Sequence, residues 1–475
     1  MGVGVSNWRL AQAVSRAGQL GVVSGTALDQ VFIRRLADGD PFGDMRRALA
    51  AFPFPKMARR ILDQYFIPGG KKKDALYPTT PLHHHSEPRK LVELCVVANF
   101  VEVFLAREGH SNPVGINFLE KVQLPHLPSI YGAMLAGVGY VLMGAGIPLH
   151  IPGVLDAFAA RRPAEYRLSV TGAAPTNPED AILHFDPSDY AEGPLPELTR
   201  PRFLAIVSSN TLAATMLRRA SGKVDGLVIE SPTAGGHNAP PRGKLQLTAS
   251  GEPLYGHRDA VDLNELRALG VPFWLAGGYG RPEKLREAIA AGATGVQVGT
   301  AFAFARESGL RDDLKSELLA EAAAGKARVF TDPLASPTGF PFKVAQLSGS
   351  LSEEPVYAAR KRVCDLGFLR EAYTTPTGAI AYRCSAEPVN SFAAKHGNPD
   401  ETNGRKCLCN ALLANIGHAQ LRPNGYVEPP LVTLGDDLNL VTQFLAPGQT
   451  TYTADDVIRT LLSNTHSIAS CPDNL

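Results

Sequence analysis

The chain has 475 residues, enough for one large domain with additions or for two or three ordinary domains. Its 47 basic and 46 acidic residues are well mixed, which argues against nucleic acid or an anionic membrane as a partner. Six cysteines are few for this length and form no disulfide framework, and no apolar run is long enough to span a bilayer. We therefore expect a cytoplasmic α/β protein.

The chain opens with a glycine-containing turn, MGVGVS, and a predicted helix over 7–17. A short apolar strand is expected over 20–23. A protein built from repeated βα units normally begins with a strand. We therefore expect the first strand of the repeat to be missing, as if the sequence started inside the first unit.

Residues 28–110 carry helical patterns rather than a single crossover, which predicts a helical insertion over one end of the sheet. The clearest patterns cover 44–51, 56–65 and 88–108. A polar loop over 68–86 holds His83, His84 and His85. Three adjacent histidines cannot all turn to one ion from an extended loop, so the sequence does not favour a metal site there.

After residue 110 the alternation of strands and helices resumes, with a second, proline-rich insertion expected over 161–200. Strands are predicted over 114–117, 140–143, 204–207, 227–230, 273–276 and 296–298. With the strand at 20–23 this makes seven, one short of a closed barrel. The predicted fold class is α/β, a (β/α)8 TIM barrel with helical insertions and a truncated first strand. An open doubly wound sheet is the alternative.

From about residue 310 the pattern changes. We expect a barrel domain over 1–310 and a mostly helical C-terminal extension over 311–475, with helices over 310–324, 353–365, 404–416 and 454–463. This extension contains Cys364, Cys384, Cys407 and Cys409. Gaps of about twenty residues and a pair separated by one residue fit no strong zinc or cluster template, so buried free thiols are favoured.

The segment 273–300, FWLAGGYGRPEKLREAIAAGATGVQVGT, predicts strand, glycine turn, helix, strand and a second glycine turn. The strand ends supply Gly277, Gly278, Gly280, Gly299 and Thr300. Two glycine-rich strand ends beside a helix N-terminus form an anion-binding site, and a phosphate group is its usual ligand. In a (β/α)8 barrel such a site follows strands 7 and 8.

The other predicted strand ends carry small residues, with Asn117 and Glu230 as polar exceptions. A long loop after Glu230 contains Gly235, Gly236 and His237. The two glycines would let the imidazole reach over a ligand, and a neutral histidine is a natural base for a carbon acid. The alternative is a surface histidine in a glycine turn.

The combination of MGVGVSNWRLAQAVSRAGQLGVVSG, PVGINFL, AGGHN and WLAGGYGRPEKLREAIAAGATGVQVGTAF resembles the nitronate monooxygenase family, formerly called 2-nitropropane dioxygenases. Relatives of that family include flavin-dependent enoyl-acyl-carrier-protein reductases and enoyl-reductase subunits of fatty acid and polyketide synthases. The resemblance covers roughly residues 1–310, and GRKCLCNALLANIG is similar to the tail of longer members.

The resemblance implies an FMN-binding barrel with the phosphate on Gly278, Gly280, Gly299 and Thr300, beside Gly277. It further implies that the turn of Gly2, Val3 and Gly4 contacts the isoalloxazine ring together with Asn117, and that Gly235 and Gly236 flank the flavin. His237 matches the histidine that acts as base in nitronate monooxygenases. Glu230 falls where many members have an FMN-binding aspartate, whereas Ser208 stands where many have lysine or glutamine.

The leading hypothesis is an FMN-dependent oxidoreductase that oxidises alkyl nitronates with O2. The first alternative is an NAD(P)H-dependent enoyl-thioester reductase, for which an acyl carrier protein would be a partner. The second is a non-catalytic barrel subunit. A homodimer is left open by the sequence.

Overall fold

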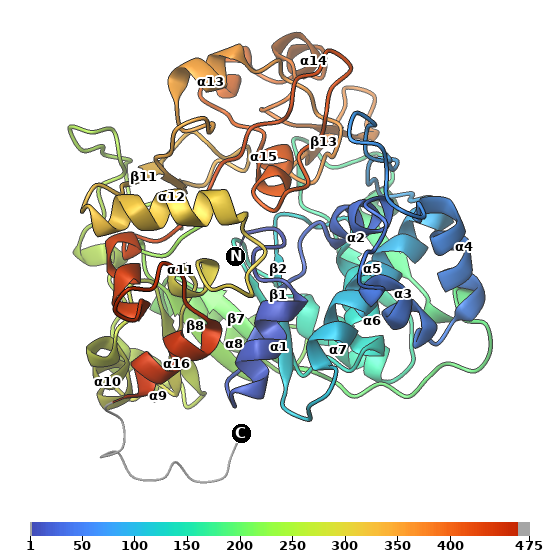
Figure 1. Ribbon diagram of the computed structural model, residues 1–475. Helices are drawn as coiled ribbons and strands as arrows, with labels where there is room; N and C mark the ends of the chain where they lie inside the picture. Colours follow the sequence, from blue (N-terminus) through green and yellow to red (C-terminus); the bar gives the residue numbers. More distant parts are fainter. Residues whose placement is uncertain (1, 464–475) are drawn as a thin grey trace.

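A curled parallel sheet of seven strands forms the centre of the computed structural model, which describes residues 2–463 (Figure 1). The strands are β1 (Gly21–Ser24), β2 (Val114–Leu119), β3 (Tyr140–Gly144), β7 (Arg202–Val207), β8 (Gly226–Glu230), β9 (Phe273–Ala276) and β10 (Gly295–Gln297). Each begins and ends within two residues of a strand predicted from the sequence.

The order of the sheet is β1-β2-β3-β7-β8-β9-β10, so each strand lies beside the next strand of the sheet along the chain. A doubly wound sheet reverses its strand order at a switch point, and this sheet does not. The alternative architecture is therefore wrong. In the described part of the chain, no strand pairs with the outer edges of β1 and β10.

Helices cover the outside of the sheet because parallel strands need crossovers that bury both faces. Those directly before or after the strands are α1 (Trp8–Arg16), α6 (His126–Leu135), α7 (Ile151–Ala159), α8 (Asn210–Arg219), α9 (Leu263–Ala268) and α10 (Pro282–Ala290). Val114, Ile116 and Val141 are fully buried in the largest apolar core.

Four helices separate β1 from β2; three of them match the predicted helical patterns, and α2 is an additional helix. They are α2 (Leu28–Ala37), α3 (Asp44–Ala50), α4 (Pro55–Tyr65) and α5 (Arg89–Arg107). α5 is the centre of this group, with 15 of its 19 residues buried, and it contacts α1, α2, α3 and α6. In Figure 1 the group lies to one side of the sheet.

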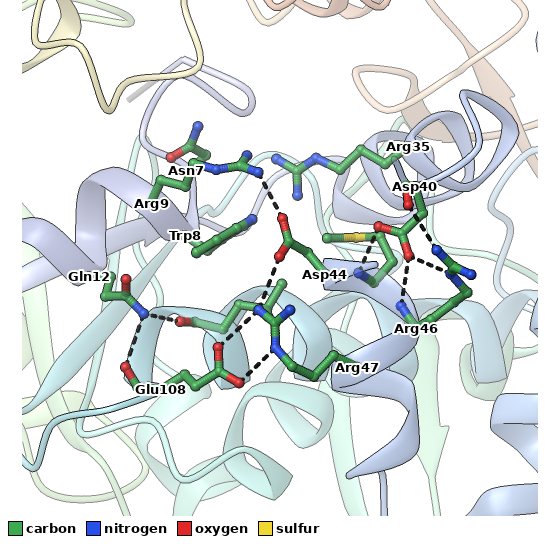
Figure 2. Close-up of polar contacts among 12 residues, drawn as sticks. Asn7, Trp8, Arg9, Gln12, Arg35, Asp40, Asp44, Arg46, Arg47 and Glu108 are labelled. Carbon is green, nitrogen blue, oxygen red and sulfur yellow. Dashed lines mark hydrogen bonds and ion pairs between the residues drawn. The ribbon is translucent and has the colours of Figure 1, made fainter. Parts of the chain in front are cut away.

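A polar network fixes α1 against this group (Figure 2). Gln12 Nε2 donates to two carbonyls at the end of α5, at 2.9 and 3.0 Å. Asp44 of α3 accepts from Arg9 at 2.8 Å and from Arg47 at 3.0 Å, and Arg47 also pairs with Glu108 at 2.9 Å. The attachment of α1 sets the position of the glycine turn that precedes it.

Between α7 and β7 the chain forms short extended and 3-10 segments. These are β4 (Ala164–Arg167), β5 (Val170–Thr171), η1 (Pro178–Ala181), β6 (Ile182–Phe185) and η2 (Pro187–Asp189). β4 pairs with β6, and β5 pairs with β13 from the C-terminal region.

The chain after β10 mixes helices, strand pairs and irregular segments. Its elements are α11 (Thr300–Ala303), α12 (Asp312–Ala323), β11 (Val329–Asp332), β12 (Phe342–Ala345), α13 (Glu354–Ala359), β13 (Glu371–Thr374), β14 (Ile380–Arg383), α14 (Val389–Ala394), η4 (Pro399–Thr402), α15 (Leu408–Ala414), η5 (Leu438–Phe444) and α16 (Ala454–Leu462). β11 pairs with β12 and β13 with β14, both antiparallel. The loop before α9 adds η3 (His257–Asp259).

The last helix, α16, lies between α1 and α10, the helices next to the two edge strands (Figure 1). A second apolar core joins α1, α11, α12, η5 and α16, and Leu10 and Val14 are the contribution of α1. Tyr452, just before α16, donates from its hydroxyl to the Ala301 carbonyl at 2.6 Å and forms a bridge with Ala305. The C-terminal region thus fills the seam that strand pairing leaves open.

Across the described residues, none of the helices combines the length and the apolar character that a bilayer crossing requires.

Candidate active site

One large cavity lies at the carboxyl ends of the sheet strands and encloses about 1180 Å³, including its opening to solvent. Ten of the twelve residues predicted to hold a cofactor line it: Gly2, Asn117, Glu230, Gly235, Gly236, Gly277, Gly278, Gly280, Gly299 and Thr300. The remaining two, Val3 and Gly4, do not line it. Residues from the first turn to the last sheet strand therefore meet at one place.

The two glycine-rich strand ends form one end of this cavity. Gly277 and Gly278 have φ values of +89° and +73°, a left-handed conformation that favours glycine. A Cβ at Gly277 would lie 2.4 Å from Ser231 Oγ. A Cβ at Gly299 would meet nothing within 4 Å, so open space lies above its backbone. Both features suit a ligand that approaches the main chain closely.

Asp437 lines this end of the cavity, whereas Arg281 does not line it. Burial raises the pKa of Asp437, against a hydrogen bond with Thr300 and the positive charge of Arg281, which both lower it, and the neutral acid can donate a hydrogen bond to an anion. The buried Nε of Arg281 has no hydrogen-bond partner. Thr300 Oγ1 accepts from the Gly435 N–H at 3.0 Å. The surroundings are therefore compatible with a phosphate group.

Asn117 of β2 and Glu230 of β8 are the polar side chains at the other strand ends that line the cavity. Asn117 Oδ1 is buried and has no hydrogen-bond partner in the protein, so it is an acceptor free for a ligand. Burial raises the pKa of Glu230 to about 7. At neutral pH this carboxyl is balanced between donating and accepting hydrogen bonds.

The N-terminal turn reaches the cavity through Gly2, Val5 and Ser6. Gly4 lies behind it with φ +63°, and a Cβ there would come within 2.5 Å of Ile416 Cδ1. Val3 is buried beside the apolar cluster that includes Leu413. These two positions shape the turn but do not face the cavity.

His237 follows the two cavity glycines but is not one of the residues lining the cavity. Its Nε2 lies 2.6 Å from Ser336 Oγ. Its ring and that of Phe342 form a T-shaped pair with their centroids 4.8 Å apart. Burial lowers the pKa of His237 to about 3. The imidazole is therefore neutral at physiological pH and a much weaker base than the sequence suggested.

The C-terminal region supplies a wall of the cavity that the sequence did not predict. Its residues at the cavity are Asn415, Val432, Thr433, Leu434, Gly435 and Asp437. Thr433 Oγ1 accepts from the Gly236 N–H at 2.8 Å, and the Asp436 N–H donates to the Thr233 carbonyl at 3.0 Å. These bonds fix the tail against the glycine loop.

Of the three adjacent histidines, His83 is buried between two carboxylates. Its Nδ1 lies 2.5 Å from Glu87 and its Nε2 lies 3.4 Å from Asp29. The charge of Glu87 raises the pKa of His83 against the opposing effect of burial. His85 instead bonds to the Tyr382 hydroxyl at 2.9 Å. The histidines attach the loop to α2 and to the C-terminal region.

A model of the nitronate monooxygenase family matches residues 176–332. The matched segment contains Glu230, His237 and both glycine-rich strand ends. The match supports the prediction of an oxidoreductase over this third of the chain. Within that class, the resemblance to the nitronate monooxygenase family is confirmed over these residues.

A search of curated proteins finds no match. Solved structures similar to this chain include FabK from Thermotoga maritima, with 15% identity over 98% of this chain and 90% of that chain and a TM-score of 0.48. A nitroalkane oxidase from Streptomyces ansochromogenes is 14% identical, with 98% of this chain and 94% of that chain covered and a TM-score of 0.47. The enoyl reductase domain of MlnA from Bacillus amyloliquefaciens is 12% identical, with 98% of this chain and 93% of that chain covered and a TM-score of 0.44.

The raised pKa of Glu230 predicts a pH-dependent stability effect. The folded state holds this proton up to about pH 7, whereas the ordinary value is 4.5, so stability is lost as pH rises through that window. Glu230→Gln should therefore stabilise the flavin-free protein at pH 8, by roughly 1–2 kcal/mol, but not at pH 4.5. Thermal unfolding at both pH values measures this.

Exposed Glu265 on α9 provides the matched control, since Glu265→Gln should change stability little at either pH. An equal effect of Glu230→Gln at pH 4.5 and pH 8 would contradict the assignment.

Proposed function

We propose that this chain is an FMN-dependent oxidoreductase of the nitronate monooxygenase type, which oxidises alkyl nitronates with O2. The observation that carries the proposal is one cavity that is lined by both glycine-rich strand ends and by the polar side chains of Asn117 and Glu230. The family match covers most of these groups. FMN combines a phosphate with a flat, hydrogen-bonding ring and so suits both ends.

The proposal treats the seven sheet strands as strands two to eight of a (β/α)8 barrel. β9 and β10 then become strands 7 and 8, after which barrels commonly bind phosphate. Residues 1–310 form the cofactor-binding unit, with insertions at 28–110 and 161–200. The extension over 311–475 closes the site.

The backbone N–H groups of Gly278, Gly280, Gly299 and Thr300 would hold the phosphate, beside Asp437, whose pKa burial raises. The ring would lie toward Asn117 and Glu230, with Gly235 and Gly236 along it. When bound, FMN supplies the ring that accepts and passes on electrons.

The low pKa of His237 bears on the substrate class. A nitronate is already an anion and needs no base at its carbon, whereas a neutral nitroalkane must first lose a proton. The hydrogen bond between His237 Nε2 and Ser336 Oγ leaves Nδ1 as the ring nitrogen for a further partner. We therefore propose that His237 acts on the nitronate by holding the Gly235–Gly236 loop in place rather than by removing a proton.

The same property of His237 favours one alternative, an NAD(P)H-dependent enoyl-thioester reductase. That reaction requires hydrogen bonding to a thioester carbonyl and no strong base. In this alternative NAD(P)H reduces the flavin, and an acyl carrier protein delivers the substrate. The two functions differ in what reduces FMN.

Gly299→Ala tests the phosphate cradle. The new methyl group meets nothing within 4 Å and the φ of −116° is ordinary, so the apoprotein should fold with unchanged stability. It would occupy the space above the backbone, and FMN affinity should fall about tenfold or more. Fluorescence titration with FMN measures the loss.

The matched control for this substitution is Gly256→Ala, which also has open space and an ordinary φ of −122° but lies outside the cavity lining. Equal FMN affinity in both variants would place the phosphate elsewhere.

Kinetics with propionate-3-nitronate test the function. The FMN-loaded protein should consume O2 with the nitronate but not with the neutral nitroalkane. His237→Gln should raise KM about tenfold while kcat changes only a few-fold, whereas loss of a general base would lower kcat by about 10²–10⁴.

No oxygen uptake with nitronate, together with rapid bleaching of the flavin by NAD(P)H, would reject the monooxygenase and support the enoyl-thioester reductase.

A further inference from the structure

The cysteines of the C-terminal region converge on one small enclosed pocket. Four of the five cysteines in the described chain line it: Cys364, Cys384, Cys407 and Cys409. They come from the segment after α13, the end of β14 and the start of α15. The rest of the lining is mainly apolar and includes Pro337, Leu366, Leu369 and Leu408. Cysteines that are separated by about twenty residues along the chain thus meet at a single site in the fold.

We propose that this four-cysteine pocket binds an iron–sulfur cluster. Four thiolates are the common ligand set of [2Fe–2S] and [4Fe–4S] clusters, and soft thiolates select iron–sulfur centres, zinc and Cu(I) over harder ions. An apolar enclosure excludes water from the metal and its bridging sulfides.

Hydrogen-bond donors surround the sulfurs. The backbone amide of Ala386 favours the thiolate form of Cys384, and those of Phe368 and Leu369 favour the thiolate form of Cys409, since each lowers the pKa of its thiol. Cys407 Sγ accepts from Asn410, whose Nδ2 lies 3.6 Å away. Donors to sulfur stabilise the thiolate form that binds metal and tune the potential of a cluster.

Cationic side chains of the same region face these sulfurs. Positive charge acts on Cys364 from Arg370 and Lys395, on Cys384 from Arg370 and Arg405, and on Cys407 from Arg360. A site of four thiolates with a bound cluster carries net negative charge. Cations at its border offset that charge, although Arg360 also pairs with Glu428 and Lys395 with Glu387, both at 2.6 Å.

The spacing of the sulfurs favours a cluster over a single ion. Tetrahedral zinc with Zn–S bonds of about 2.3 Å brings four sulfurs to about 3.8 Å from one another. Within residues 2–463, Asp29, His83 and Cys95 form the one group whose three candidate ligand atoms all lie within 4.8 Å of each other. Among the described residues, no three of the four sulfurs therefore lie within 4.8 Å of one another, which is wider than the spacing around one zinc ion.

α15 connects this pocket to the flavin cavity. Cys409 lies in its first turn and Asn415 at its end, six residues or about 9 Å apart along the helix axis. Asn415 lines the large cavity and exchanges two hydrogen bonds with the Leu431 backbone, at 2.7 and 3.1 Å. A bound cluster would therefore fix the wall that closes the flavin site. The inference does not depend on which reaction that site performs.

The test is metal and sulfide analysis of the full-length protein, purified anaerobically from iron-supplemented cells and, separately, reconstituted with Fe²⁺ and sulfide. We expect iron and acid-labile sulfide in similar amounts, about two to four per chain. The dithionite-reduced protein should give an electron paramagnetic resonance signal distinct from that of flavin. Cys384→Ser and Cys407→Ser should each lower the iron content at least about fivefold.

Cys95→Ser is the matched control, because Cys95 is a buried cysteine of α5 that does not line the pocket. It should retain iron and sulfide. Soluble wild-type protein that holds neither after reconstitution would overturn the proposal. So would stoichiometric zinc without sulfide, or equal loss of iron in the Cys95 variant.

Discussion

The rest of the structure depends on how an open parallel sheet is closed. Seven strands leave the edges of β1 and β10 without a strand partner in the described chain, and unpaired edges expose backbone groups and apolar helix faces. In the C-terminal region, α16 packs between α1 and α10, the helices next to these two edge strands, and contributes to a second apolar core. The same region then turns inward and walls the cavity. Closure of the sheet and completion of the site are therefore one structural event.

The cavity favours neutral groups over charged ones. Burial raises the pKa of Glu230 and of Asp437 and lowers that of His237, so each group moves toward its uncharged form. The attraction for an anion then falls to backbone N–H groups. Such a site can hold a phosphate and a flat ring without a fixed counter-charge beneath the ring.

The sheet and the glycine cradle were predictable because their signals are local. Short apolar runs ending in glycine mark β9 and β10 within a few residues, and positions such as Gly277 need a left-handed backbone that glycine adopts readily. The tail wall was not predictable, because Thr433 meets Gly236 across almost two hundred residues. The predicted helix over 353–365 ends at Ala359, where the chain turns toward the cysteine pocket. The low pKa of His237 likewise depends on burial by the tail loop that carries Ser336.

The central claim is that the two glycine-rich strand ends hold the phosphate of a flavin. Calorimetric titration of the flavin-free protein with FMN and with riboflavin tests this most directly, because the two ligands share the ring and differ in the phosphate. The account predicts that FMN binds at least about a hundredfold more tightly, through charge-assisted bonds from the backbone N–H groups. Equal affinity for the two ligands would contradict it.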